Sequence, residues 1–153
     1  MPKAMTNALL LMADDDAEDR LLARDALRES RLNAEVRFVE DGEELLDYLH
    51  RRGRYAPPAA APLPGLVLLD LNMPRKDGRE ALAEIKNDAR LRKIPVVVLT
   101  TSKRDEDVQR SYSAGANSFV VKPVTFQGLV DLMMTLKRYW LETVELPACV
   151  RPT

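Results

Sequence analysis

The chain has little of what builds disulfide frameworks and membrane spans. It contains one cysteine, Cys149, which excludes an internal disulfide and a metal cluster held by several cysteines. No stretch approaches the roughly 18 consecutive apolar residues of a membrane helix, and residues 1–8 lack the apolar core of a signal peptide. We therefore expect a cytoplasmic protein with no membrane partner.

An excess of basic residues is also missing. The formal net charge is −1, whereas a nucleic-acid-binding domain needs a basic balance or a basic face. We expect no nucleic-acid partner. The 153 residues, 46% of them hydrophobic, are enough for one domain with a real core. We place this domain at residues 9–141, between an N-terminal segment, 1–8, and a C-terminal tail, 142–153.

Short apolar segments alternate with amphipathic ones along the chain. The apolar or alternating segments predict strands at 9–13, 35–39, 66–69, 95–100 and 118–121. Helical spacing predicts helices at about 18–30, 43–52, 79–88, 104–114 and 125–141. A strand followed by a helix five times over predicts an α/β fold, with a five-stranded parallel sheet and helices on both faces.

Details of the predicted helices and loops carry further expectations. In the first helix Leu21, Leu22, Ala26 and Leu27 form an apolar stripe. In the fourth helix Val108 and Tyr112 lie one turn apart, and the last helix has a stripe ending at Trp140 that suits either the core or a dimer contact. Four prolines and two glycines make Gly53–Gly65 an irregular surface connection.

One acidic residue ends the most apolar strand. Residues 66–69 read as a buried central strand, Asp70 follows directly, and Pro74 cannot continue a strand. Asp70 is therefore expected at the carboxyl end of the strand, which is the edge where open α/β sheets bind ligands. Taken alone, Asp70 could also be a simple strand-end cap.

Other polar residues follow the remaining strands. Asp14 and Asp15 come after the first, Thr100 after the fourth and Lys122 after the fifth, so parallel strands bring all of them to one edge. Carboxylates gathered there repel one another, and a hard cation such as Mg²⁺ relieves that repulsion. A lysine and a hydroxyl nearby can bind phosphoryl oxygens. The set suits a phosphoryl group carried on Asp70, because carboxylates act as nucleophiles in phosphoryl transfer.

Simpler interpretations exist for each residue. Asp14 to Asp16 could form a solvated helix start, which we favour for Asp16. Lys122 could be an ordinary surface lysine, and Thr100 could be present only as a β-former. His50 invites interpretation as a phosphodonor, but it lies on a predicted helix away from the strand-end edge, so we consider it incidental.

Together these motifs resemble the response-regulator receiver domain of two-component signalling. The resemblance runs from about Leu9 to Leu141. The motifs that carry it, each placed at or just after a strand end, are Asp14-Asp15, Asp70 within Leu68-Leu69-Asp70-Leu71-Asn72-Met73-Pro74, Asp77-Gly78, Thr100 and Lys122-Pro123. The resemblance implies a flavodoxin-like sheet with strand order 2-1-3-4-5.

The resemblance also implies roles for the residues at the edge. Asp70 would accept a phosphoryl group from a histidine kinase. Asp14, Asp15, Asp70 and the backbone carbonyl of Asn72 would hold Mg²⁺ (or Mn²⁺). Lys122 would pair with Asp70 and then with its phosphoryl group.

The same resemblance assigns a switch around the site. Thr100 would bond a phosphoryl oxygen, Phe119 would be the switching aromatic residue, and the Lys122–Pro123 peptide bond would be cis. Phe119 lacks the hydroxyl of a tyrosine switch, and plain core packing suits it equally well. Thr101 stands where the family often has alanine, so a larger side chain would narrow access to the phosphoryl group.

Features outside the site suggest a subfamily. The proline-rich connection, residues 88–93 and the extended tail are similar to the single-domain regulators of bacterial phytochromes, so we expect no DNA-binding or catalytic output domain after the receiver. This likeness implies a phytochrome-type sensor histidine kinase as partner. It also implies a homodimer formed through the fourth helix, the fifth strand, the fifth helix and the tail.

Two other functions compete with the phosphorylated switch. One is a phosphohydrolase with an aspartyl nucleophile, which needs a second aspartate two residues after the first, where this chain has Asn72. The other is an interaction module on the same fold that works without phosphate. The intact set of acids, threonine and lysine argues against such a module.

Overall fold

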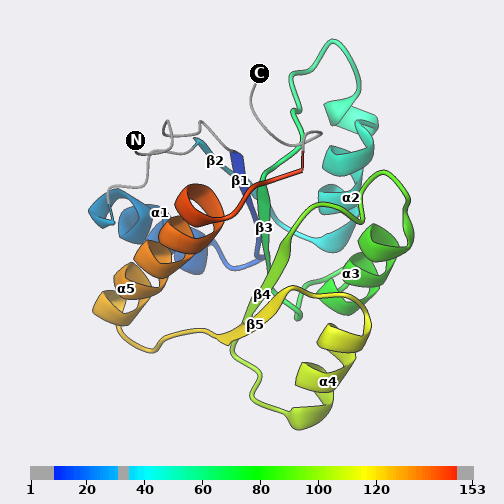
Figure 1. Ribbon diagram of the computed structural model, residues 1–153. Helices are drawn as coiled ribbons and strands as arrows, with labels where there is room; N and C mark the ends of the chain where they lie inside the picture. Colours follow the sequence, from blue (N-terminus) through cyan, green and yellow to red (C-terminus); the bar gives the residue numbers. More distant parts are fainter. Residues whose placement is uncertain (1–8, 31–34, 148–153) are drawn as a thin grey trace.

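A computed structural model describes residues 9–30 and 35–147 (Figure 1). The strands are β1 (Leu9–Ala13), β2 (Glu35–Val39), β3 (Leu66–Leu69), β4 (Val96–Thr100) and β5 (Ser118–Val121). The α-helices are α1 (Ala17–Glu29), α2 (Gly42–His50), α3 (Gly78–Asn87), α4 (Asp105–Ser113) and α5 (Phe126–Leu136). All neighbouring strands pair in parallel, in the order β2-β1-β3-β4-β5, which confirms the predicted fold and topology.

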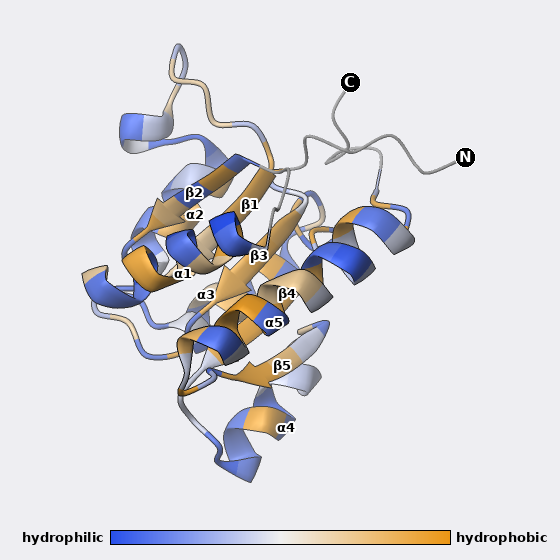
Figure 2. Cartoon of the chain, turned by 90° about the vertical axis from the view of Figure 1, so that its left-hand side faces the viewer, coloured by the Kyte–Doolittle hydropathy of each residue, from blue (hydrophilic) through white to orange (hydrophobic). Residues whose placement is uncertain are grey.

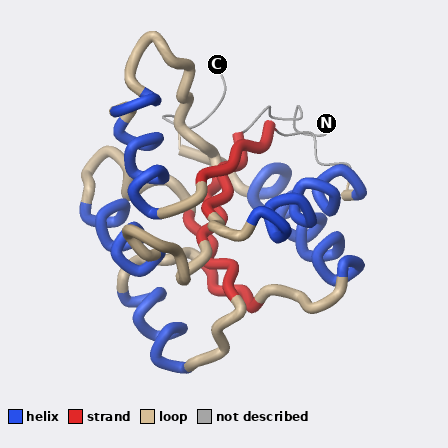
Figure 3. The backbone as a smooth tube through the Cα atoms, turned by 180° about the vertical axis from the view of Figure 1, so that it is seen from behind, coloured by secondary structure: helices blue, strands red, loops and turns tan. Residues whose placement is uncertain are grey.

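Successive residues of the inner strands point to opposite faces of the sheet, and both sets are apolar. Helices therefore cover both faces. Leu9 and Leu11 of β1 belong to the core on the α2 and α3 side, whereas Leu10 and Met12 belong to the core on the α1 and α5 side. Figures 1 and 3 show the sheet between these two layers from opposite sides. In Figure 2 the inner strands β1, β3 and β4 are largely hydrophobic. None of the described helices has the length and hydropathy needed to cross a bilayer.

Four helices begin at a side chain that caps them. Asp16, Asp41, Asp77 and Thr125 accept hydrogen bonds from backbone N–H groups in the first turns of α1, α2, α3 and α5. The structure confirms that Asp16 starts a helix. Because three of these caps closely follow a strand, the capped turns fix the loops along one edge of the sheet.

In two helices the buried residues differ in part from those that apolar spacing suggests; Ala26 and Leu27 of α1 are buried as predicted. In α1, Leu21 is 56% exposed and Leu22 is 40% exposed, and the buried face is made by Ala23, Ala26 and Leu27. In α4, Tyr112 is 51% exposed. The helix buries Asp107 and Ser111 instead, because its inner side faces polar groups.

The last helix ends differently from the prediction. The α-helix stops at Leu136, and a π-helical segment, Lys137–Thr143, carries the chain onward. Trp140 is half-buried against both cores, while Leu141 and Leu146 pack into the core that α2 and α3 cover. The packed chain thus runs past residue 141, and residues 148–153 of the predicted tail lie outside the described part.

The proline-rich connection is irregular, as predicted, but it is anchored. A 3-10 turn, Gly53–Tyr55, opens it. Near its far end the Tyr48 hydroxyl donates to the carbonyl of Pro62 at 2.8 Å, and Nε of Arg51 donates to the carbonyl of Ala61 at 3.0 Å. These bonds tie the connection to α2.

Candidate functional site

Three carboxylates meet at the carboxyl edge of the sheet. Asp14 and Asp15 follow β1 and Asp70 follows β3, and these neighbouring strands end together because Ala13 pairs with Leu69. One carboxylate oxygen from each of the three acids lies within 4.8 Å of the others. The N–H of Asp70 donates to the carbonyl of Ala13 at 3.0 Å, which fixes the two strand ends in register.

The local environment makes these charges costly. Asp14 is fully buried, Asp70 is 8% exposed, and Asp15 is exposed. Burial raises the pKa of Asp14 above its ordinary value of 3.8, against hydrogen bonds from Lys122 and from the N–H of Asp16 that lower it. Three converging carboxylate oxygens, two of them in buried groups, are the donor set that a hard divalent cation prefers. The residues present therefore fit Mg²⁺ or Mn²⁺.

A glycine supports the backbone of Asp70. The N–H of Gly78 donates to the carbonyl of Leu71 at 2.9 Å, so α3 begins directly beneath the loop. A Cβ added to Gly78 would lie 2.1 Å from the backbone oxygen of Asp70 and 2.8 Å from Cα of Leu71. Only glycine permits this approach, which gives the predicted Asp77-Gly78 turn its physical reason.

Lys122 brings the positive charge to the acids. Its Nζ lies 2.7 Å from Oδ2 of Asp14, 2.9 Å from Oδ2 of Asp19 and 3.3 Å from Oδ2 of Asp70. Its backbone N–H donates to the carbonyl of Thr100 at 2.7 Å, which holds the end of β5 beside β4. Burial lowers the pKa of Lys122, but hydrogen bonds to Asp14 and Asp19 and the charge of Asp70 outweigh burial and raise this pKa.

The predicted cis peptide at Lys122–Pro123 is wrong. Among the described residues the only cis peptide bond is Pro57–Pro58, and the Lys122–Pro123 bond is trans. The trans form is the lower-energy state of most X–Pro bonds. In this form the Lys122 side chain already reaches Asp14 and Asp70, so no other isomer is needed to place the ammonium group.

The predicted switch residues occupy the strand ends next to this cluster. Thr100 is fully buried at the end of β4, and its Oγ1 accepts a hydrogen bond from the N–H of Ser102 at 3.4 Å. Thr101 is exposed. Phe119 is half-buried against the core under α2 and α3, and its N–H donates to the Tyr112 hydroxyl at 3.2 Å. The roles of these residues, and of the Asn72 carbonyl as a ligand, stay predictions.

Sequence reasoning missed Asp19 as a partner of Lys122. Asp19 lies in the first turn of α1, and its contact with Lys122 depends on the rotation of that helix about its axis, which local sequence does not fix. His50, in contrast, is at the far end of α2, where its Nε2 lies 4.0 Å from Oδ2 of Asp88. Its partner is thus Asp88 and not a strand-end carboxylate.

An ion pair with a buried carboxylate, next to the site, was also missed. Asp107 of α4 is 3% exposed, and Nε and Nη2 of Arg79 lie 3.0 and 2.9 Å from its Oδ1. The Ser102 hydroxyl donates to Oδ2 of Asp107 at 2.6 Å. The hydrogen bond from Ser102 has the largest effect on the pKa of Asp107. Together with Arg79 it holds this pKa below its usual range, although desolvation acts in the opposite direction. The only sign of it in the sequence was that Asp107 and Ser111 are polar and four residues apart, and so lie on one side of the helix.

Comparison with known proteins identifies this arrangement. The response regulator receiver domain family matches residues 10–134. The chain therefore belongs to the response regulator receiver domain family and is a signalling protein of that class. Response regulator Rcp1 of Synechocystis sp. is 40% identical over 140 residues, which cover 92% of this chain and 93% of Rcp1.

Solved structures agree with the fold. The Mn(2+)-bound form of Rcp1 superposes with a TM-score of 0.83, at 40% identity over 92% of this chain and 99% of the other. The phosphorylated cyanobacterial phytochrome response regulator RcpA has a TM-score of 0.84 at the same identity and coverage. RPA3017, a response regulator in red light signalling of R. palustris, has a TM-score of 0.86 at 37% identity, covering 92% and 99% of the two chains.

Proposed function

We propose that this response regulator accepts a phosphoryl group on Asp70 from a phytochrome-type sensor histidine kinase, with Mg²⁺ or Mn²⁺ bound beside it. The observation that carries the proposal is the convergence on Asp70 of two further carboxylates and of the Lys122 ammonium. The relatives support it: RcpA is a phosphorylated phytochrome response regulator, and Rcp1 binds Mn²⁺.

The proposed reaction exchanges one bond at phosphorus for another. A carboxylate oxygen of Asp70 forms a new P–O bond, the P–N bond of the kinase phosphohistidine breaks, and the imidazole nitrogen leaves with the electron pair. Asp14, Asp15, Asp70 and the backbone carbonyl of Asn72 would hold the cation, whose charge offsets that of the carboxylates and phosphoryl oxygens. Lys122 donates a hydrogen bond to one phosphoryl oxygen, and the Thr100 hydroxyl donates to another.

The consequence is a switch rather than turnover of a substrate. A phosphoryl group adds about −1.5 to −2 charges at Asp70, which draws Thr100 and Lys122 toward it and repositions Phe119. The changed surface is the face made by α4, β5 and α5, through which two copies pair. The protein works in the cytoplasm, and its own chemistry is limited to acquiring and slowly hydrolysing the phosphoryl group.

The test is labelling by a small phosphodonor. Incubated with acetyl phosphate and Mg²⁺, the protein should gain the mass of one phosphoryl group, and Asp70→Asn should abolish the gain. Asp77→Asn is the matched control, because Asp77 is an acid of the same loop and asparagine also caps a helix. Labelling of Asp70→Asn to the wild-type extent would refute the assignment. Steady release of phosphate from esters would instead indicate a phosphohydrolase.

The partner is tested by timed phosphotransfer. A phosphorylated phytochrome-type kinase should transfer its labelled phosphoryl group to the wild-type protein rapidly, at a rate limited by the binding of the two proteins. An unrelated sensor kinase is the control. Equal transfer from both kinases would contradict the proposed pairing while leaving the role of Asp70 intact.

A further inference from the structure

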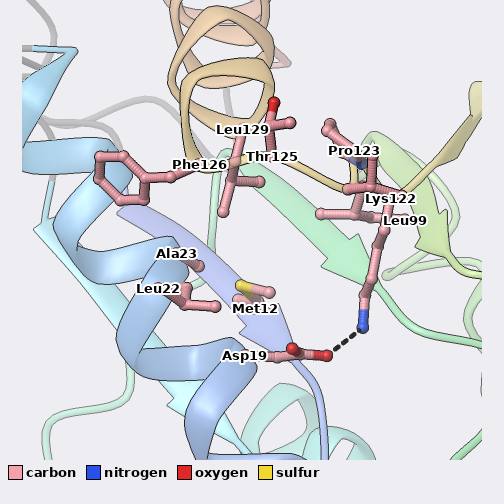
Figure 4. Close-up of a pocket in the computed structure, with 11 residues that line it drawn as sticks. Met12, Asp19, Leu22, Ala23, Leu99, Lys122, Pro123, Thr125, Phe126 and Leu129 are labelled. Atoms are coloured by element: carbon pink, nitrogen blue, oxygen red, sulfur yellow. Dashed lines mark hydrogen bonds and ion pairs between the residues drawn. The ribbon is translucent and has the colours of Figure 1, made fainter.

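The Lys122 ammonium is shared with an acid that lies outside the carboxylate cluster. Oδ2 of Asp19 is 2.9 Å from Nζ of Lys122, closer than Oδ2 of Asp70, which is 3.3 Å away. Figure 4 shows the Asp19 carboxylate extending from α1 directly to the end of the Lys122 side chain. The ammonium is therefore drawn toward α1 as well as toward the phosphoacceptor.

The three hydrogens of the ammonium match its three partners. An ammonium group has three N–H donors and no acceptor, and here the acceptors are Asp14, Asp19 and Asp70. A phosphoryl oxygen arriving at Asp70 must displace one of these bonds or share a hydrogen with it. Asp14 is fully buried and cannot turn to water, whereas the Asp19 side chain is 38% exposed. The bond to Asp19 is thus the one that the protein can vary at least cost.

The surroundings strengthen the Asp19–Lys122 pair. Lys122 and Asp19 line a pocket whose other walls are mostly apolar, including Met12, Leu22 and Leu129. The Lys122 side chain is 13% exposed and that of Asp19 is 38% exposed, so water screens the pair mainly at Asp19. Apolar walls lower the local dielectric and make the attraction stronger than in water.

We propose that Asp19 is a positioning residue that holds Lys122 on the α1 side of the site and slows phosphoryl transfer to Asp70. The inference rests on the proposed function of Asp70. The negative charge of Asp19 acts through Lys122, because it takes part of the ammonium charge that would otherwise stabilise the transferring phosphoryl group. Removing this charge, without changing the shape of the side chain, should therefore speed phosphorylation.

The test measures the rate of labelling by acetyl phosphate at saturating Mg²⁺ for each variant. In this reaction the new P–O bond to Asp70 forms while the P–O bond to the acetyl group breaks and acetate leaves with the electron pair. Asp19→Asn should be labelled about fivefold faster than wild type, the factor that a partly exposed ion pair can supply. Asp19→Glu, which keeps the charge, should restore the wild-type rate.

Matched variants separate this role from a structural one. Glu18→Gln removes one charge from the same turn at an exposed residue and should leave the rate unchanged. In a Lys122→Met background, Asp19→Asn should change the rate less than about twofold, because the effect passes through the ammonium. An equal acceleration in both backgrounds, or an unchanged or slower Asp19→Asn protein, overturns the inference.

The two proposals fail in different ways. If Asp19→Asn combined with Asp70→Asn is still labelled, Asp70 is not the acceptor and the proposed function fails. If labelling requires Asp70 but Asp19→Asn is no faster than wild type, the proposed function stands and only the role of Asp19 is rejected.

Discussion

Three carboxylates and one ammonium group dominate the site at the scale of single residues. Asp14, Asp15 and Asp70 repel one another. Lys122 offsets only part of that repulsion, because its ammonium group also pairs with Asp19. Like charges at this spacing oppose folding, and a bound divalent cation removes the penalty. A cation that binds only the folded chain must therefore also stabilise it.

Replacing one of these acids should remove most of the increase in stability that Mg²⁺ gives the folded protein. For wild type, Mg²⁺ at about 100 times its dissociation constant should add about 2.7 kcal/mol to the free energy of unfolding and raise Tm by about 5–10 °C. Asp15→Asn should lose most of this shift, measured by differential scanning fluorimetry. Asp16→Asn, at the neighbouring exposed cap, should keep it. An undiminished shift in Asp15→Asn would remove Asp15 from the ligand set.

At the scale of elements, polar contacts hold α4 in place. α4 lacks a side-chain cap at its start, and its buried side contains Asp107, which pairs with Arg79 of α3 and with Ser102 of the preceding loop. Nη1 of Arg79 also lies 3.5 Å from Oδ1 of Asn72. One arginine thus connects the loop after Asp70 to the helix that follows Thr100.

This contact predicts a pH-dependent loss of stability. The folded protein holds the pKa of Asp107 below the ordinary 3.8, so its contribution is complete above that pH and disappears as the pH falls through the folded-state value. Asp107→Asn should cost about 1–3 kcal/mol at pH 7 and clearly less at pH 3, measured by urea unfolding. Asp105→Asn, exposed on the same helix, is the control. A cost independent of pH would contradict an ionised Asp107.

The sequence allowed the elements to be foreseen wherever burial imposes a pattern. The strands at 9–13, 35–39, 66–69 and 118–121 have the predicted bounds, because apolar or alternating segments define them. The buried side of α4 was not foreseen, since an ion pair between α3 and α4 leaves no periodicity in either helix. Leu21 and Leu22 were expected on the buried face of α1. Ala23 and Ala26 lie there instead, and their small side chains allow the helix to approach the sheet closely.

The residues of the site also divide into those that the sequence allows to be placed and those that it does not. Asp14, Asp15, Asp70 and Lys122 could be placed together because parallel strands end at one edge. Asp19 could not, because its contact depends on the rotation of α1 about its axis. The isomer of the Lys122–Pro123 bond depends on the path of the loop after β5, which local sequence does not fix.

At the scale of the whole molecule, seven large apolar side chains of the described residues are exposed, two on α1 (Leu21 and Leu22) and five on or next to α4, β5 and α5. Tyr112 of α4, Val121 of β5, Val124 and Phe126 at the start of α5, and Tyr139 lie partly or fully exposed. Large apolar side chains exposed together are typical of surfaces that bind another protein. They support the proposed pairing of two copies through α4, β5 and α5.

The pairing is testable by its dependence on phosphorylation. Light scattering should show a larger fraction of dimer after labelling with acetyl phosphate than before. Tyr112→Asp should weaken this dimer about tenfold or more, because it places an unpaired charge in an apolar contact. Leu21→Asp, an equally exposed position on α1, should not. If Leu21→Asp abolishes the dimer and Tyr112→Asp does not, the contact lies on the α1 side.

The strand order has a consequence for how the protein is made. The central neighbours β1 and β3 supply every acid of the cluster, whereas the lysine arrives on the edge strand β5, 108 positions after Asp14. Because a domain generally folds as a unit, synthesis must reach that lysine before the acids gain their charged partner. Until β5 docks against β4, the acids of this rim lack the ammonium group that offsets part of their charge.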